Sequence, residues 1–303
     1  MGHTPSRRGK GLAAYLDAWN PDPVTTVDVL RAEPLAAFGA LLDVPDVPAG
    51  AGPPDAPVAG GHLPPLWHWL YFLDWPAQRD LGTDGHPAHG SFLPPVPDRR
   101  RMIAGGRAEF TAPLTVGAEA RRTTGLAKTE VKHGRTGEMV FVTVRHEIIQ
   151  EGRVRVVEEQ DVVYRSGEDT RRRGRFGCDT GDAPEAAEPW QLVLRPSPSL
   201  LFRFSALTAN AHRIHYDTPY CKDVEGYPGL VVHGPLLVLL MLQAARAHAP
   251  GRTVRGLSYR LHQPLFAGEQ LLALGGPDGE RGAELRVASR RDERHASARV
   301  TFA

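Results

Sequence analysis

Apolar and polar residues alternate most clearly in the middle of the chain. Val140, Val142 and Val144 occupy every second position, and the same period returns over residues 154–164. Between the two runs, residues 150–152 read Gln-Glu-Gly, which is typical of a tight turn. A period of two on both sides of a turn predicts an antiparallel hairpin.

Similar patterns predict the other elements. We expect a helix at 24–43, strands at 107–114 and 119–132, a strand-like lead-in at 200–207, a strongly apolar helix at 234–249, and strands at 254–263, 270–275, 284–290 and 296–302. A long apolar helix followed by an antiparallel meander predicts a sheet wrapped around that helix. Because the order of elements repeats, we expect an α+β protein built from two such units.

A polar stretch without apolar period separates the two halves. It contains three consecutive arginines and then an acidic segment, so its charges oppose each other. We therefore predict an N-terminal domain at residues 1–165, a linker at 166–195 and a C-terminal domain at 196–303. Irregular loops rich in Pro and Gly are expected at 44–65 and 76–101, on either side of an aromatic segment at 66–72.

Composition narrows the range of partners and compartments. The 303 residues include 36 Lys+Arg and 35 Asp+Glu, so no basic field exists to bind nucleic acid. The longest apolar stretch, 235–242, is far shorter than the ~20 residues of a membrane span, so we expect no membrane partner. Two cysteines, Cys178 and Cys221, make no disulfide framework, which favours a cytoplasmic protein.

Side chains suited to catalysis are densest at residues 208–217, just before the apolar helix. This segment contains Asn210, His212, Arg213, His215 and Asp217, a composition too polar for a core strand. If it forms a turn and a short helix, Asn210 and His215 converge from opposite ends of the turn, and His212 lies one helical step from His215.

A second candidate element is His233-Gly234-Pro235, which opens the apolar helix. Proline suits the first helical turn, and glycine allows close approach of a ligand. The free amides at this helix start could polarise a carbonyl oxygen. Alternatively, Gly234 and Pro235 simply begin a buried helix.

Residues 201–217 and 226–236, together with the aromatic segment 67–72, resemble the MaoC-like hot-dog hydratases. The similarity is closer to the branch of 3-hydroxyacyl-thioester dehydratase type 2 and mesaconyl-C4-CoA hydratase. It implies a double hot-dog fold and reversible addition of water to an acyl thioester, usually of coenzyme A but alternatively of an acyl carrier protein, with no cofactor. Short dicarboxylic acyl groups such as mesaconyl or itaconyl are implied by this branch.

In the wider family an Asp and a His, five positions apart, hold the reacting water, and this pattern places Asn210 and His215 in those roles. Asn210 departs from the pattern, and because an amide does not ionise, the proton transfers are expected at His215. Asn210 is expected to orient the water, and the Gly234 amide to bind the enolate oxygen.

Supporting roles are expected for the neighbouring side chains. Asp217 either fixes the tautomer of a neighbouring imidazole or caps the turn at Thr218-Pro219. His212 is a possible supporting residue, and Arg213 is a candidate for an anionic group of the substrate. Tyr216 and His233 complete the expected substrate-binding set.

Three alternatives stay open. A metal site would use His212, His215, Asp217 and His233, but His-x-x-His without a following Glu is a poor zinc motif, so we expect no metal. Hot-dog proteins also hydrolyse thioesters, and a non-catalytic acyl-binding protein would tolerate Asn210. A homodimer is expected by fold analogy.

Overall fold

The computed structural model describes residues 11–43, 61–97, 99–134, 137–166, 176–183 and 185–303. Its strands are β1 (Val24–Val29), β2 (Arg99–Phe110), β3 (Glu119–Gly134), β4 (Gly137–Gln150), β5 (Arg153–Ser166), β6 (Trp190–Leu194), β7 (Val254–Leu261), β8 (Leu271–Asp278), β9 (Gly282–Ser289) and β10 (Ala296–Phe302). Its α-helices are α1 (Ala32–Leu41), α2 (Pro198–Leu207) and α3 (Gly234–His248). Short helical turns lie at Leu12–Tyr15, Trp67–Leu70, Gln78–Asp80, Arg213–His215 and Tyr220–Glu225.

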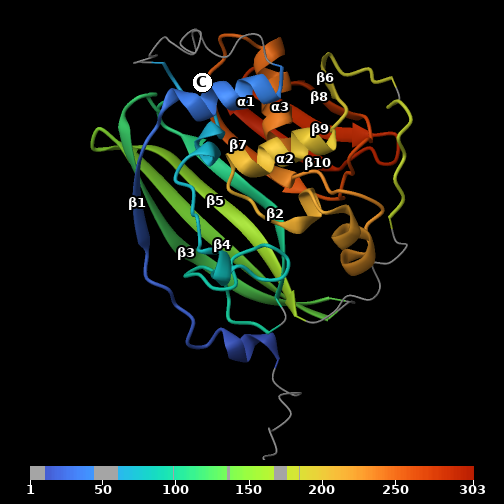
Figure 1. Ribbon diagram of the computed structural model, residues 1–303. Coiled ribbons are helices and arrows are strands. Elements are labelled where there is room, and N and C mark those ends of the chain that lie inside the picture. The colour runs from blue at the N-terminus through green and yellow to red at the C-terminus, as the bar shows by residue number, and fades with distance from the viewer. Residues whose placement is uncertain (1–10, 44–60, 98, 135–136, 167–175, 184) are drawn as a thin grey trace, which may run out of the picture.

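All ten strands form one antiparallel sheet, in the order β1-β3-β4-β5-β2-β7-β10-β9-β8-β6. The first five strands come from the N-terminal half and the last five from the C-terminal half. The halves join where β2 pairs with β7, from Gly105↔Arg260 to Glu109↔Gly256. In Figure 1 the three α-helices gather over the C-terminal strands, while the long N-terminal strands extend away from them.

The predicted hairpin and apolar helix are confirmed. β4 and β5 pair through a two-residue loop, Glu151 and Gly152, both with positive φ, as the right-handed twist of a tight hairpin favours. α3 is buried along most of its length and packs against β6, β8, β9 and β10. Because α3 carries apolar side chains on all of its faces, it is stable only where the C-terminal strands curl around it.

Two sequence expectations are wrong. Residues 24–43 are not one helix: the Val-Thr-Thr-Val run forms edge strand β1, since β-branched residues favour strands, and α1 starts only at Ala32. Residues 200–207 are not strand-like: they form α2, which Ser197 caps by accepting a hydrogen bond from the Leu200 amide at 3.2 Å. A short apolar run fits both the helical period of about 3.6 residues and the strand period of two residues. Here the Ser197 cap favours the helix.

The strands at 107–114 and 119–132 are confirmed as β2 and β3, but β2 begins earlier, at Arg99. The range 166–195 taken as a linker contains β6, which pairs with β8 at the edge of the sheet. Residues 44–60, 167–175 and 184 lie outside the described residues, so most of one expected loop and part of the linker cannot be compared.

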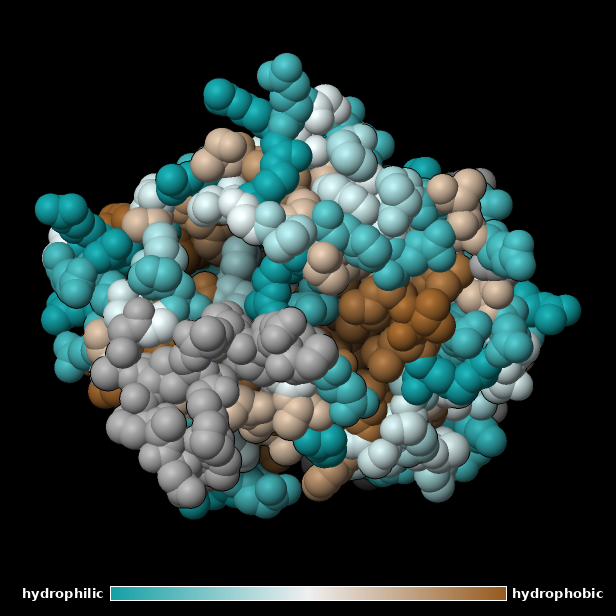
Figure 2. All heavy atoms as spheres, turned by 90° about the horizontal axis from the view of Figure 1, so that it is seen from above, coloured by the Kyte–Doolittle hydropathy of each residue, from teal (hydrophilic) through white to brown (hydrophobic). Residues whose placement is uncertain are grey.

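One hydrophobic core joins the two halves. The ring of Phe38 on α1 lies 4.7 Å from that of Trp67 and 5.9 Å from that of Phe204 on α2, measured between centroids. The N-terminal aromatic segment thus packs against the elements that precede the candidate site. Seen from above, most of the surface is hydrophilic and apolar side chains gather in one recess (Figure 2). No described helix is both long and apolar enough to cross a bilayer.

Candidate active site

His215 ends the helical turn Arg213–His215 and is only 6% exposed. Its Nδ1 lies 2.8 Å from the carbonyl oxygen of Val231. A carbonyl only accepts hydrogen bonds, so Nδ1 carries the proton and Nε2 keeps a free lone pair. Burial lowers the pKa of His215 to about 4, although the hydrogen bond to Val231 raises it. The ring is therefore neutral at pH 7 and can accept a proton at Nε2.

His233, the residue before α3, stacks on His215. The ring centroids are 3.5 Å apart and the planes differ by 16°. Its Nε2 lies 2.8 Å from Ser205 Oγ on α2, whereas Nδ1 is buried and has no partner among the described residues. Burial first, and then the charges of His215 and His212, keep the pKa of His233 well below its usual range. The stack fixes the orientation of the His215 ring and disfavours a proton on either imidazole.

Gly234 is the first residue of α3, and no described group accepts a hydrogen bond from its amide. A Cβ added at Gly234 would lie 2.3 Å from Cδ1 of Leu261, so glycine allows β7 to approach the helix start. Both expected roles are thus compatible with the geometry: Gly234 begins a buried helix, and its amide remains available at the positive end of the helix.

Asn210 lies between α2 and the turn that carries His215. Its Oδ1 accepts a hydrogen bond from the His212 amide at 3.0 Å, and its own amide donates to the Ser205 carbonyl at 2.9 Å. The amide oxygen keeps a second lone pair, and Nδ2 has no acceptor within the described part of the chain. Asn210 therefore shapes the loop and retains polar groups with which to hold a water molecule.

Three other expected site residues are bound to the protein itself. Arg213 donates from Nε and Nη2 to Asp217 Oδ2 at 3.0 and 2.8 Å, and from Nη1 to the Thr83 carbonyl at 2.9 Å. Asp217 Oδ1 accepts the Tyr220 amide at 3.0 Å, as expected of a residue that caps a turn. The Tyr216 hydroxyl donates to the Ala211 carbonyl, and the side chain is 45% exposed. These contacts brace the loop around His215.

A loop of the N-terminal half, residues 82–86, completes the site. Gly85 has φ +88°, and a Cβ there would lie 1.9 Å from the Ala211 carbonyl oxygen. The Arg213 amide donates to the Asp84 carbonyl at 2.9 Å. The centroids of the His86 and His212 rings are 4.0 Å apart, and those of His212 and His215 are 5.5 Å apart. Four imidazoles thus follow one another from the N-terminal loop to the start of α3.

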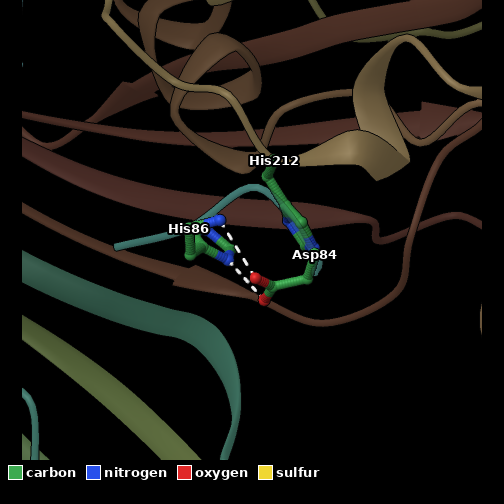
Figure 3. Close-up of side chains that lie close together, drawn as sticks. All are labelled: Asp84, His86 and His212. Atoms are coloured by element: carbon green, nitrogen blue, oxygen red, sulfur yellow. Dashed lines mark hydrogen bonds and ion pairs between the residues drawn. The ribbon is translucent and has the colours of Figure 1, made fainter. Parts of the chain in front are cut away.

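Asp84 orients His86. Its carboxylate accepts hydrogen bonds from the His86 amide and from Nδ1 of the ring, both at 3.0 Å (Figure 3). Burial alone would raise the pKa of Asp84, but the hydrogen bonds and charge of His86 lower it to about 2. Burial lowers the pKa of His86 despite Asp84. Asp84 is thus ionised at pH 7 beside two neutral imidazoles.

Asp84, His86 and His212 each offer a ligand atom within 4.8 Å of the others, a donor set that suits Zn²⁺. Figure 3 shows the His212 side chain reaching toward the other two. The positive charge of Arg101, which helps to lower the pKa of both His86 and His212, opposes a dication at this position. His215, Asp217 and His233, expected in a rival metal site, do not join this cluster.

An apolar cavity of about 160 Å³ lies at the other end of α3. Leu242, Ala245, Trp67, Phe110 and Phe302 are among its lining residues, and no residue of 208–217 or 233–235 lines it. This cavity therefore does not adjoin His215.

Comparison with known proteins identifies the family. A model of the family described as hydroxyacyl-thioester dehydratase type 2 matches residues 66–267. A mesaconyl-C(4)-CoA hydratase from Chloroflexus aurantiacus is 43% identical over 263 residues, which are 84% of this chain and 86% of that protein. The chain belongs to the hydroxyacyl-thioester dehydratase type 2 family. A mitochondrial member from Schizosaccharomyces pombe is 41% identical over 81 residues, 26% of this chain and 27% of that protein.

Solved structures confirm the double hot-dog fold expected for this dehydratase family member. A MaoC-like dehydratase from Phytophthora capsici superposes with a TM-score of 0.68 at 13% identity, over 96% of this chain and 98% of that one. A Mycobacterium tuberculosis protein described as having a double hotdog fold gives a TM-score of 0.58 at 15% identity, over 95% and 97% of the two chains. With its family and fold established, the chain is a hydro-lyase acting on acyl thioesters.

Asp84 and His86 were not predicted as site residues of this dehydratase. They lie in the Pro- and Gly-rich range 76–101, which reads as an irregular loop. The available signal was local: an Asp and a His surround a glycine within Gly-Thr-Asp-Gly-His-Pro. Glycine next to polar residues indicates close backbone approach, but nothing along the chain specifies that the approach is to Ala211.

Proposed function

We propose that this protein hydrates a short dicarboxylic 2-enoyl thioester of coenzyme A, and dehydrates the corresponding 3-hydroxyacyl thioester. The name of the Chloroflexus aurantiacus relative supports the substrate, because mesaconyl-C(4)-CoA carries its thioester at one end and a free carboxylate at the other. The observation that carries the proposed mechanism is the hydrogen bond from His215 Nδ1 to the Val231 carbonyl, which leaves Nε2 as the proton acceptor.

In the hydration direction, Nε2 of His215 takes a proton from water while the water oxygen bonds to C3. The electron pair of the C2–C3 double bond moves toward the thioester carbonyl, where the Gly234 amide stabilises the enolate oxygen. The same imidazolium then returns the proton to C2. Asn210 holds the water with its free lone pair or with Nδ2, and the stacked His233 ring keeps His215 in orientation.

A free imidazole with a pKa of about 4 is a weak base at neutral pH. An anion bound nearby raises this pKa, because it favours the charged form of the ring. A substrate with its own carboxylate beside the reacting carbon would therefore make His215 more basic as it binds. This effect favours a dicarboxylic acyl group over a simple enoyl group.

Supporting residues and the assembly are part of the proposal. His212, Arg213, Tyr216 and Asp217 position the loop that carries His215. We further propose a cytoplasmic homodimer without metal: the free thiols Cys178 and Cys221 suit a reducing compartment, and hot-dog folds often pair. Light scattering coupled to size exclusion measures the oligomer, and elemental analysis the metal.

The decisive test is incubation of the purified protein with a panel of enoyl-CoA esters that includes mesaconyl-C4-CoA and crotonyl-CoA. Loss of the conjugated-thioester absorbance without release of thiol supports hydration. Release of free thiol at the same rate would instead assign a thioesterase, the second reaction that hot-dog proteins carry out. Binding without either change would identify an acyl-binding protein.

A further inference from the structure

A dicarboxylic acyl thioester presents a carboxylate that must be matched by a cation near His215. Arg213 is the nearest in sequence, but its Nε, Nη1 and Nη2 all donate to the protein, and its guanidinium carbon lies 4.2 Å from the Tyr220 ring centroid. If Arg213 turned to bind a substrate carboxylate, its hydrogen bonds to Asp217 and to the 82–86 loop would be lost. Another cation is therefore the better candidate.

Three consecutive arginines begin β2, and they differ in their partners. Arg99 donates to the carbonyls of Pro94 and Ala88 at 2.9 and 2.7 Å, and Arg100 donates to Glu225 Oε2 at 2.8 Å. Arg101 is half-buried, and its guanidinium makes no hydrogen bond or ion pair with any residue that the structure describes. A half-buried guanidinium without an acceptor is prepared for an anionic ligand.

The position of Arg101 on β2 places its charge near the candidate active site. Side chains two apart on a strand share a face, so Arg101 lies on the same face of β2 as Arg99. Arg99 donates a hydrogen bond to the carbonyl of Ala88, which is two residues after His86. Its cross-strand neighbour on β5 is the buried Tyr164. The Arg101 charge acts on both His86 and His212, whose rings lead to His215.

We propose that Arg101 binds the free carboxylate of a four-carbon dicarboxylic acyl thioester, in a subsite walled by His86 and His212 and adjoining His215. This inference deepens the proposed function and rests on it. The planar guanidinium suits bidentate contact with a carboxylate. Asp84 is bonded to His86 and makes no hydrogen bond or ion pair with Arg101 in the described chain. In such a substrate the carboxylate is attached to C3, the carbon that receives water, so the subsite has to adjoin the acid–base residue.

Binding is tested with two thioesters that lack the C2–C3 double bond and differ in one group. Succinyl-CoA carries a carboxylate on C3, and butyryl-CoA carries a methyl group in its place. Isothermal titration of the wild type should show succinyl-CoA bound tighter by about tenfold or more, the scale of a charge-assisted hydrogen-bonded pair. Arg101→Gln should remove this preference and leave butyryl-CoA affinity unchanged, and Arg101→Lys should restore part of it.

The control is Arg107→Gln, on the same strand, where the side chain is exposed and pairs with Asp161 at 3.1 Å. It should retain the full preference for succinyl-CoA. In turnover, Arg101→Gln should lower kcat/KM for mesaconyl-C4-CoA by on the order of a hundredfold while crotonyl-CoA changes little.

Several results would overturn the subsite. The wild type could show no preference for succinyl-CoA, or Arg101→Gln could weaken both ligands equally, as a structural role predicts. A preference that disappears with chelator and returns with Zn²⁺ would assign the carboxylate to a metal at Asp84, His86 and His212. If the preference depends on Arg101 but neither enoyl thioester is hydrated, the proposed reaction is wrong and the subsite stands.

Discussion

The two halves of the molecule each bury a polar cluster, and the clusters are built in opposite ways. In the N-terminal half, Glu158 on β5 is 2% exposed and accepts hydrogen bonds from His68 Nε2 at 2.8 Å, Trp69 Nε1 at 2.9 Å and Gln160 Nε2 at 2.8 Å. Burial alone would raise the pKa of Glu158, but the hydrogen bond and charge of His68, with smaller contributions from His146 and Gln160, lower it to about 2.

In the C-terminal half, no carboxylate of the described residues forms a hydrogen bond or ion pair with the stacked rings of His215 and His233. One nitrogen of each ring is bonded, to Val231 and Ser205, and the other is left without a partner in the described chain. A saturated cluster holds its charge and its geometry, whereas a cluster with spare lone pairs can exchange protons. Of these two clusters, the one around His215 and His233 keeps lone pairs that can exchange protons, whereas the lone pairs of the Glu158 carboxylate are occupied.

The largest effect is expected from His215→Ala. Removing the acid–base group should lower kcat for hydration by on the order of a thousandfold. The matched control is His146→Ala in the N-terminal half, whose pKa burial also lowers to about 4 and whose Nδ1 lies 2.9 Å from Thr124 Oγ1. The control should keep its activity per folded molecule, measured by loss of enoyl absorbance. Equal losses in both variants would contradict the contrast.

Glu158→Ala should instead destabilise the fold by about 3–5 kcal/mol, because His68 and Trp69 lose their buried acceptor. Urea unfolding followed by fluorescence measures the change. Glu159→Ala, the adjacent position on the other face of β5, removes more exposed ion pairs with Arg107 and Arg145 and should cost only about 1 kcal/mol. A Glu158 variant as stable as the Glu159 variant would show that the saturated cluster is not structural.

His215 and Glu158 should lose their contributions to stability in different pH ranges. The pKa of His215 is lowered from 6.5 to about 4, so the unfolded chain binds more protons between these values. The contribution of His215 to the unfolding free energy therefore falls by about 3 kcal/mol as pH drops from 6.5 to 4. The pKa of Glu158 is lowered from 4.5 to about 2, and its comparable contribution is lost between pH 4.5 and 2.

Urea unfolding at each pH measures both ranges. His215→Gln should reduce the loss of stability in the higher range alone, and Glu158→Gln should reduce it in the lower range alone. The opposite assignment of ranges would contradict the protonation states described for the clusters.

The smallest expected effect compares two glycines with positive φ. Gly152 in the β4–β5 turn has open space where a Cβ would lie, so Gly152→Ala should cost about 1 kcal/mol of strain. Gly85→Ala adds a collision with the Ala211 carbonyl and should also lower kcat/KM by about tenfold, since the 82–86 loop must move. Unchanged activity of Gly85→Ala would mean that this loop does not support the site.

Much of the fold was predictable from the sequence. The helix at 234–249, the meander after it and the hairpin before it have strong periods, and the structure has all three. The segment 208–217 was recognised by its density of polar side chains. Residues 24–43 and 200–207 were misread because a short apolar run carries no unique period, so pairing with β3 and the Ser197 cap decided their structure.

The amino-acid sequence alone predicts the α+β pattern, the buried helix α3 and His215 as the candidate base. Other features depend on the tertiary structure: Asp84 and His86 of one half meet His212 of the other, and Arg101 has no hydrogen-bond or ion-pair partner among the described residues while Arg213 is fully engaged. The physical reason is that periodicity and composition report local preferences, whereas contacts across more than a hundred residues depend on how the sheet closes around the helices. Hydrogen bonds left unmade are likewise known only when every neighbour is in place.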